Sequence, residues 1–183
     1  MPSDPRVRDL VAVFGERASG LLLAAIAIPA IIPVPGVPLG AVFGTVLVIV
    51  ACRMVTAGEE FSLPEWLAQM RLKPSAVRML AHQGPGILQK FEGRIKPRAG
   101  LLTTGPAKPM LALVMVLMGI LIALPIPFGN ILPGFAVILM GLGLAARDGL
   151  AILSALALAF LATGTSVALG WAAVWGLAHL LAS

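Results

Sequence analysis

Two proline-rich interruptions of apolar sequence carry the residues best suited to binding chemistry. Proline lacks an amide donor and glycine allows close backbone approach, so the chain can turn at such places without water. The helix that follows presents free N–H groups and the positive end of its dipole, which favour a negatively charged or polar ligand. The candidate substrate-binding residues in the two interruptions are Pro33, Pro35, Gly36, Pro125, Pro127, Gly129 and Asn130.

Three charged residues beside the apolar segments complete this set of candidates. Arg53 ends the segment after the first interruption, and Arg147 and Asp148 end the segment after the second. Charged side chains within or beside membrane segments often mark a substrate path. Structural alternatives stay open. Asp148 can cap the helix that follows it, Asn130 can cap another helix, and the arginines can reach lipid phosphates.

Motifs of enzymes, metal sites and cofactor sites are absent from the sequence. It contains no Walker loop, no nucleophile elbow and no pair of carboxylates within an apolar segment, and His82 and His179 are isolated. We therefore expect no catalysis, no metal and no cofactor. Gly141 and Gly143 are expected to permit close helix packing. A phosphate-binding role is less expected, because no strand precedes them. Cys52 lies in an apolar run and is expected to be buried.

The composition is that of a membrane protein. Apolar residues make up 59% of the chain and charged residues 11%, with a mean hydropathy of +1.01, whereas about a quarter of the residues of a soluble domain are charged. From residue 101 to the end, the formal charges are Lys108, Arg147 and Asp148. This half cannot present a polar surface to water, so we expect an integral membrane protein in contact with lipids.

The basic residues concentrate between the two interruptions. Residues 56–108 contain eight Lys and Arg against four Glu, so the positive-inside rule places this loop in the cytoplasm. Leu63, Trp66, Leu67 and Met70 recur there at helical spacing, which predicts short amphipathic helices on the membrane surface. Lipid headgroups explain the positive charge better than nucleic acid, because no aromatic stacking surface accompanies it.

The two interrupted regions resemble each other, since each has a Pro-X-Pro break, an uncharged stretch and then an arginine. This pattern predicts an all-α, polytopic integral membrane protein with two repeated, Pro/Gly-broken, re-entrant helical hairpins and intervening amphipathic surface helices. It forms one membrane domain over residues 1–183, with repeat 1 at 19–55, the cytoplasmic or interfacial region at 56–106, repeat 2 at 107–148, and one or two membrane helices at 149–183.

The sequence also leads to expectations about helix lengths and about assembly of the chain. The apolar pieces at about 20–32 and 39–52 are each too short to cross a membrane alone. Thr163-Gly164-Thr165 is the place where the tail is expected to bend, either as a kink in one helix or as a turn between two. Short hairpins need a covering partner, so a homodimer is expected. Inverted and parallel arrangements of the repeats are both open.

The order of prolines, asparagine and Arg-Asp-Gly resembles the signature of the ExoD family. The matching residues are Leu124-Pro125-Ile126-Pro127-Phe128-Gly129-Asn130-Ile131-Leu132-Pro133-Gly134, Gly141-Leu142-Gly143-Leu144, Arg147-Asp148-Gly149, Pro33-Val34-Pro35-Gly36, Arg53, Leu63-Pro64 and Lys96-Pro97-Arg98. The segment Thr56-Ala57-Gly58-Glu59-Glu60 departs from the more basic sequence expected there. The resemblance implies a multi-pass protein of the bacterial inner membrane involved in exopolysaccharide synthesis, and it implies no catalytic residue.

Three classes of function remain open at this point. The paired breaks favour transport or exchange of an unknown small or ionic substrate, at a site near the bilayer midplane. The surface helices, and the lack of carboxylates within the apolar segments, favour a non-transporting lipid-binding or scaffold protein that supports exopolysaccharide synthesis. An integral membrane enzyme has the weakest support.

Overall fold

The computed structural model describes residues 17–32, 38–57, 65–69, 107–124 and 129–182. Every regular element in these ranges is an α-helix, which confirms the all-α prediction. The helices are α2 (Ala18–Ile31), α3 (Leu39–Ala57), α4 (Glu65–Ala68), α6 (Ala107–Ala123), α7 (Ile131–Ala146) and α8 (Gly149–Ala182). Long apolar segments favour helices because a helix satisfies its backbone polar groups internally.

Proline positions set several helix ends. α3 begins directly after Pro38, whose carbonyl oxygen accepts a hydrogen bond from the Val42 N–H at 3.1 Å. α6 ends just ahead of Pro125, because proline disfavours the helical conformation in the residue before it. α3 continues beyond Cys52 to Ala57, and its 19 residues are long enough to cross a membrane. The expectation that both apolar pieces of the first repeat are too short is therefore wrong for α3.

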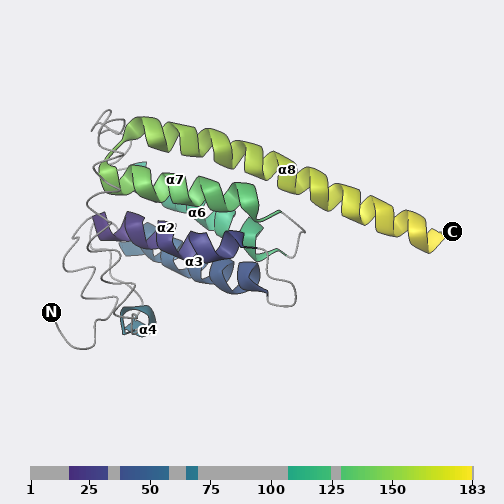
Figure 1. Cartoon of the computed structure of the whole chain (residues 1–183), viewed down its shortest axis with the longest axis horizontal. Coiled ribbons are helices and arrows are strands. Elements are labelled where there is room, and N and C mark those ends of the chain that lie inside the picture. The colour runs from purple at the N-terminus through teal and green to yellow at the C-terminus, as the bar shows by residue number, and fades with distance from the viewer. Residues whose placement is uncertain (1–16, 33–37, 58–64, 70–106, 125–128, 183) are drawn as a thin grey trace.

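Four helices form a bundle of two antiparallel pairs, α2 with α3 and α6 with α7 (Figure 1). Across the pairs, α2 packs on α7 and α3 packs on α6, while α8 lies along α7 and α6 and runs on beyond them. The interior is apolar, and its largest fully buried side chains are Leu23, Leu47, Val50, Met115, Met118, Ile122, Val137, Met140 and Ile152.

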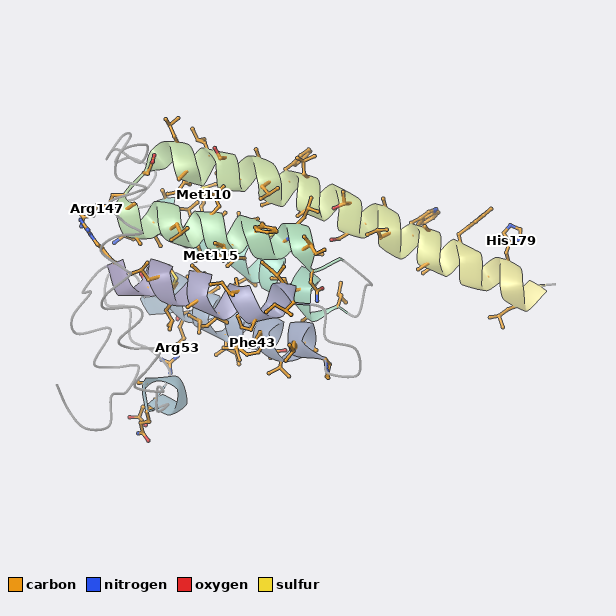
Figure 2. All side chains as sticks on the ribbon, in the orientation of Figure 1. Phe43, Arg53, Met110, Met115, Arg147 and His179 are labelled. Atoms are coloured by element: carbon orange, nitrogen blue, oxygen red, sulfur yellow. The ribbon has the colours of Figure 1, made fainter. Side chains whose placement is uncertain are left out.

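The bundle has two chemically different ends. One end, which we call the basic end, holds all four Lys and Arg residues of the described ranges, namely Arg17, Arg53, Lys108 and Arg147. Figure 2 shows Arg53 and Arg147 at this end. The opposite end, the break end, is where α2 and α6 finish and where α3 and α7 begin. Both helix pairs therefore run in the same direction, with the end of α3 and the start of α6 at the basic end.

Glycines bring the two pairs into backbone contact along two seams. Between α2 and α7, a Cβ atom on Gly20 or on Gly141 would overlap the carbonyl oxygen of the other residue. Between α3 and α6, a Cβ atom on Gly44 would lie 2.6 Å from the nitrogen of Ala123 and 2.8 Å from the oxygen of Gly119. Small residues allow this close approach in membrane helices. The predicted packing role of Gly141 is confirmed.

The tail is one continuous helix, α8, with 34 residues. The hydroxyl of Thr163 donates to the carbonyl of Ala159 at 2.9 Å, and that of Thr165 donates to the carbonyl of Leu161 at 3.0 Å. Because these hydroxyls are satisfied by the preceding turn, the Thr-Gly-Thr sequence does not divide the helix. Together with α3, α8 is long and apolar enough to cross a membrane, and only 28% of each apolar window is buried.

Candidate functional site

The helix ends that flank the two breaks in the sequence meet at the break end. Ile31, the last residue of α2, packs on Gly134 in the first turn of α7, where a Cβ atom would lie 2.8 Å from Cδ1 of Ile31. Gly40, in the first turn of α3, faces Asn130. A Cβ atom on Gly40 would overlap Nδ2 of Asn130 and lie 2.8 Å from the carbonyl oxygen of Ile122. We call Ile31, Gly40, Ile122, Asn130 and Gly134 the break junction.

Asn130 occupies the N-cap position of α7, but its side chain makes no capping hydrogen bond. Its backbone carbonyl accepts from the Gly134 N–H at 3.0 Å, and its side chain lies against Gly40. The Oδ1 atom is buried and has no hydrogen-bond partner. The alternative that this side chain caps a helix is therefore wrong. An unpaired buried acceptor costs about 1–3 kcal/mol, so its presence calls for a physical reason.

A second buried polar atom lies at the same level of the bundle. Ser166 of α8 is 3% exposed, and its Oγ atom has no hydrogen-bond partner. Since α7 and α8 run in opposite directions from the turn at Arg147 and Asp148, a rise of about 1.5 Å per residue places Asn130 and Ser166 each about 26 Å from that turn. The sequence analysis missed Ser166, because a lone serine in an uncharged helix gives no signal of its own.

Helix ends of both polarities come together at the break end. The first turns of α3 and α7 present backbone N–H groups, and the last turns of α2 and α6 present carbonyl groups. The opposed dipoles of the four helices offset each other. This end therefore suits a ligand that both donates and accepts hydrogen bonds better than it suits a bare anion, which is a narrower chemistry than the sequence alone indicated.

Arg53, Arg147 and Asp148 lie away from the break junction, at the basic end. The 16 residues of α7 separate the two groups by about 24 Å. The structure thus brings Asn130 to the break junction with buried Gly129 beside it, and it keeps the three charged candidates apart from that place.

Asp148 caps α8, as the structural alternative proposed. It is 3% exposed, and its Oδ1 atom accepts hydrogen bonds from the N–H groups of Leu150 at 2.8 Å and Ala151 at 3.3 Å. Arg147 closes α7 in the left-handed conformation, with φ of 54°. The Asp148 N–H donates to the carbonyl of Gly143 at 2.8 Å, which completes a Schellman-type turn.

Several predicted residues lie outside the described ranges. They are Pro33, Pro35, Gly36, Pro125, Pro127 and His82. Of the predicted surface helices, the described part contains α4 alone, without the side chains of Trp66 and Leu67.

Cys52 and His179 are both exposed. The expectation of a buried Cys52 is wrong, because α3 turns Ala51 and Met54 inward and Cys52 outward. The ring of His179 meets that of Trp175 edge to face, with centroids 4.3 Å apart. Within the described residues, no group of three or more His, Cys, Asp or Glu side chains is placed to hold a metal ion.

The sequence matches the family described as "Exopolysaccharide synthesis, ExoD" over residues 2–168. Protein ExoD of Rhizobium meliloti is 29% identical over 186 residues, which cover 97% of this chain and 76% of that protein. An uncharacterized protein of Synechocystis sp. is 26% identical over 143 residues, which cover 78% of this chain and 68% of that protein. No solved structure matches. The family match spans both breaks and the Arg147-Asp148 turn, so the chain belongs to the ExoD family, whose members act in exopolysaccharide synthesis.

Proposed function

We propose that this chain acts in exopolysaccharide synthesis by binding a small polar substrate at the break junction and passing it through the bacterial inner membrane. In this proposal the two helix pairs are related, re-entrant hairpins. The observation that carries the proposal is the buried Oδ1 atom of Asn130, which has no hydrogen-bond partner at the break junction. Buried acceptors are nearly always paired, so this atom marks a place for a ligand group or an ordered water.

The residues around Asn130 leave a specific space for its side-chain amide. Gly40 leaves the space that Nδ2 occupies, because any larger residue would place its Cβ atom on that nitrogen. The offsetting helix dipoles at the break end favour a hydroxyl over an inorganic anion, since a hydroxyl both donates and accepts. A hydroxyl-bearing solute is therefore the substrate class that fits this chemistry best.

A second candidate is a non-transporting scaffold that supports the same synthesis from within the lipid. The observation in its favour is the closure of both seams by backbone contacts, at Gly20 with Gly141 and at Gly44 with Gly119. Large apolar side chains also cover the outer surface, among them Met110, Phe135 and Phe160 at 73%, 52% and 83% exposure. A tightly packed, lipid-facing bundle fits a protein that organises its neighbours without moving a solute.

The experiment is the substitution Asn130→Leu in a strain that lacks its own copy of this protein. Leucine removes the unpaired acceptor, so the variant should be as stable as the wild type or more stable, by up to about 1–3 kcal/mol. Secreted polysaccharide should nevertheless fall to the level of the null strain. Ser154→Leu is the matched control, because Ser154 is exposed on α8 and the change is chemically similar. It should restore polysaccharide fully.

A flux measurement separates the two candidates. Proteoliposomes with the wild type should take up radiolabelled sorbitol, a hydroxyl-bearing probe, faster than empty liposomes and faster than liposomes with Asn130→Leu. If Asn130→Leu restores polysaccharide at normal protein levels and the wild type adds no flux, the binding proposal fails and the scaffold stands.

A further inference from the structure

Beyond Ser166, α8 extends past the break end, away from the other described helices (Figure 1). At about 1.5 Å per residue, the 34 residues of α8 span about 51 Å, whereas the 14 to 19 residues of the bundle helices span about 21–28 Å. Side chains in the extension are exposed, including Val167 at 64% and Val174 at 69%. A Cβ atom on Gly170 or Gly176 would meet nothing within 4 Å.

Three ring-bearing side chains lie in this extension at a spacing of four residues. Trp171 and Trp175 are 75% and 62% exposed, and the ring of His179 packs edge to face on Trp175. Figure 2 shows His179 near the C-terminal end of α8. The spacing places all three on one side of the helix. Tryptophan rings prefer the membrane interface, where the ring contacts acyl chains and its N–H reaches water or headgroups.

The position of these rings along α8 matches the thickness of a bilayer. A rise of about 1.5 Å per residue places Trp171 and Trp175 about 33 and 39 Å from Gly149. The hydrocarbon core is about 30 Å thick, and headgroup regions extend it to about 40–45 Å. Gly149 lies next to the basic end. The four cations of that end belong at the opposite boundary of the hydrocarbon core from the rings. The segment between these two levels is uncharged.

We propose that Trp171, Trp175 and His179 lie in the headgroup region of the leaflet opposite the basic end, so that α8 crosses the phospholipid bilayer completely. The four cations place the basic end in the cytoplasm, and the C-terminal end of α8 then lies on the outer side. The break junction, about 24 Å from the basic end, lies about 6 Å inside the far boundary of the hydrocarbon core instead of at its midplane.

This placement goes beyond the family assignment, because the family match ends at residue 168, ahead of all three ring-bearing residues. It also stands apart from the proposed function, since it depends on the bilayer alone and on no substrate at the break junction. It makes that junction reachable from the outer face.

Depth-dependent fluorescence quenching tests the placement. The chain has three tryptophans, and Trp66→Phe leaves only those of α8. In liposomes, lipids brominated near the headgroups should quench this variant several-fold more than lipids brominated near the chain ends. The matched control replaces all three tryptophans with Phe and introduces Phe160→Trp, at about 16 Å from Gly149 and 83% exposed. It should show the reverse order of quenching.

Thiol labelling tests the orientation in a Cys52→Ala background. Ala178→Cys should react with an impermeant maleimide in intact cells, whereas Thr56→Cys should react only in inverted vesicles. Stronger quenching of Trp171 and Trp175 by the deep bromines would overturn the placement. So would weak quenching from both depths combined with disulfide-linked dimers of Ala168→Cys, because a second copy of the chain would then cover the extension.

Discussion

Replacing Gly44 with alanine tests whether backbone contact holds the two helix pairs together. The added Cβ atom would lie 2.6 Å from the nitrogen of Ala123, about 0.8 Å short of the 3.4 Å at which ordinary contact begins. Both near atoms, Ala123 N and Gly119 O, belong to the backbone of α6, so no side chain can rotate away. The α3–α6 seam must open by several tenths of an ångström.

The expected cost follows from two opposed effects. Overpacking a well-packed interior costs about 1–3 kcal/mol, and opening a contact by 0.5–1 Å forfeits about a quarter to a half of its dispersion energy. Alanine recovers up to about 1 kcal/mol of helix propensity. We expect a net destabilisation of about 1–2 kcal/mol for Gly44→Ala. Gly164→Ala, where nothing lies within 4 Å, should stabilise by up to about 1 kcal/mol.

The assay is the fraction of protein that stays monodisperse by size exclusion after heating in lipid nanodiscs. At about 2–4 °C per kcal/mol for a chain of this size, the two variants should differ by about 2–12 °C, with Gly44→Ala the lower. Equal midpoints for Gly44→Ala and Gly164→Ala would refute the reasoning. The seam would then be loose enough to admit a methyl group, and backbone contact would not be what joins the pairs.

The remaining predictions concern the turn at Arg147 and Asp148 and the other seam. Arg147→Gly should have a higher thermal midpoint than Arg147→Ala, because glycine lacks the left-handed cost of about 1–2 kcal/mol that alanine bears at this position; equal midpoints would show that the turn is not strained. Asp148→Ala should lower stability by about 1 kcal/mol through loss of the α8 cap, and Asp148→Asn should recover most of it, as measured in the same assay. Gly141→Ala should behave like Gly44→Ala, since its Cβ atom would overlap Gly20 O and lie 3.1 Å from the nitrogen of Ala24; a midpoint matching Gly164→Ala would contradict this.

Local signals in the sequence were sufficient to place most helix ends. α7 runs from Ile131 to Ala146, within the predicted second repeat at 107–148, and its C-terminal end is set by the left-handed turn at Arg147, which acts within a few residues of the chain. The cap at Asp148 is a similarly local feature. The continuity of α8 could not be predicted from the same signals. Whether Thr163 and Thr165 interrupt a helix depends on whether the carbonyls of the preceding turn satisfy their hydroxyls, and here they do.

Only part of the candidate site could be predicted from the sequence. Asn130 stood out as an amide between two prolines, but its neighbour Gly40 lies about ninety residues earlier, and only the packing of the helices brings them together. The unpaired state of Oδ1 is likewise a result of packing. The buried and exposed faces of α3 could not be predicted either, for a different reason. A helix that is apolar on every side gives no periodic signal, so the outward position of Cys52 could not be predicted.

The two seams also limit how the break junction could operate. A transporter that rocks one repeat against the other must separate their contact surface in each cycle. Here that surface consists of both seams, α2 with α7 and α3 with α6, and glycine backbones close each of them. α8, in contrast, packs only on α7 and α6 among the described helices, and it carries Ser166 to the level of Asn130. Any opening of the junction is therefore expected from movement of α8, while the four bundle helices stay together as one unit.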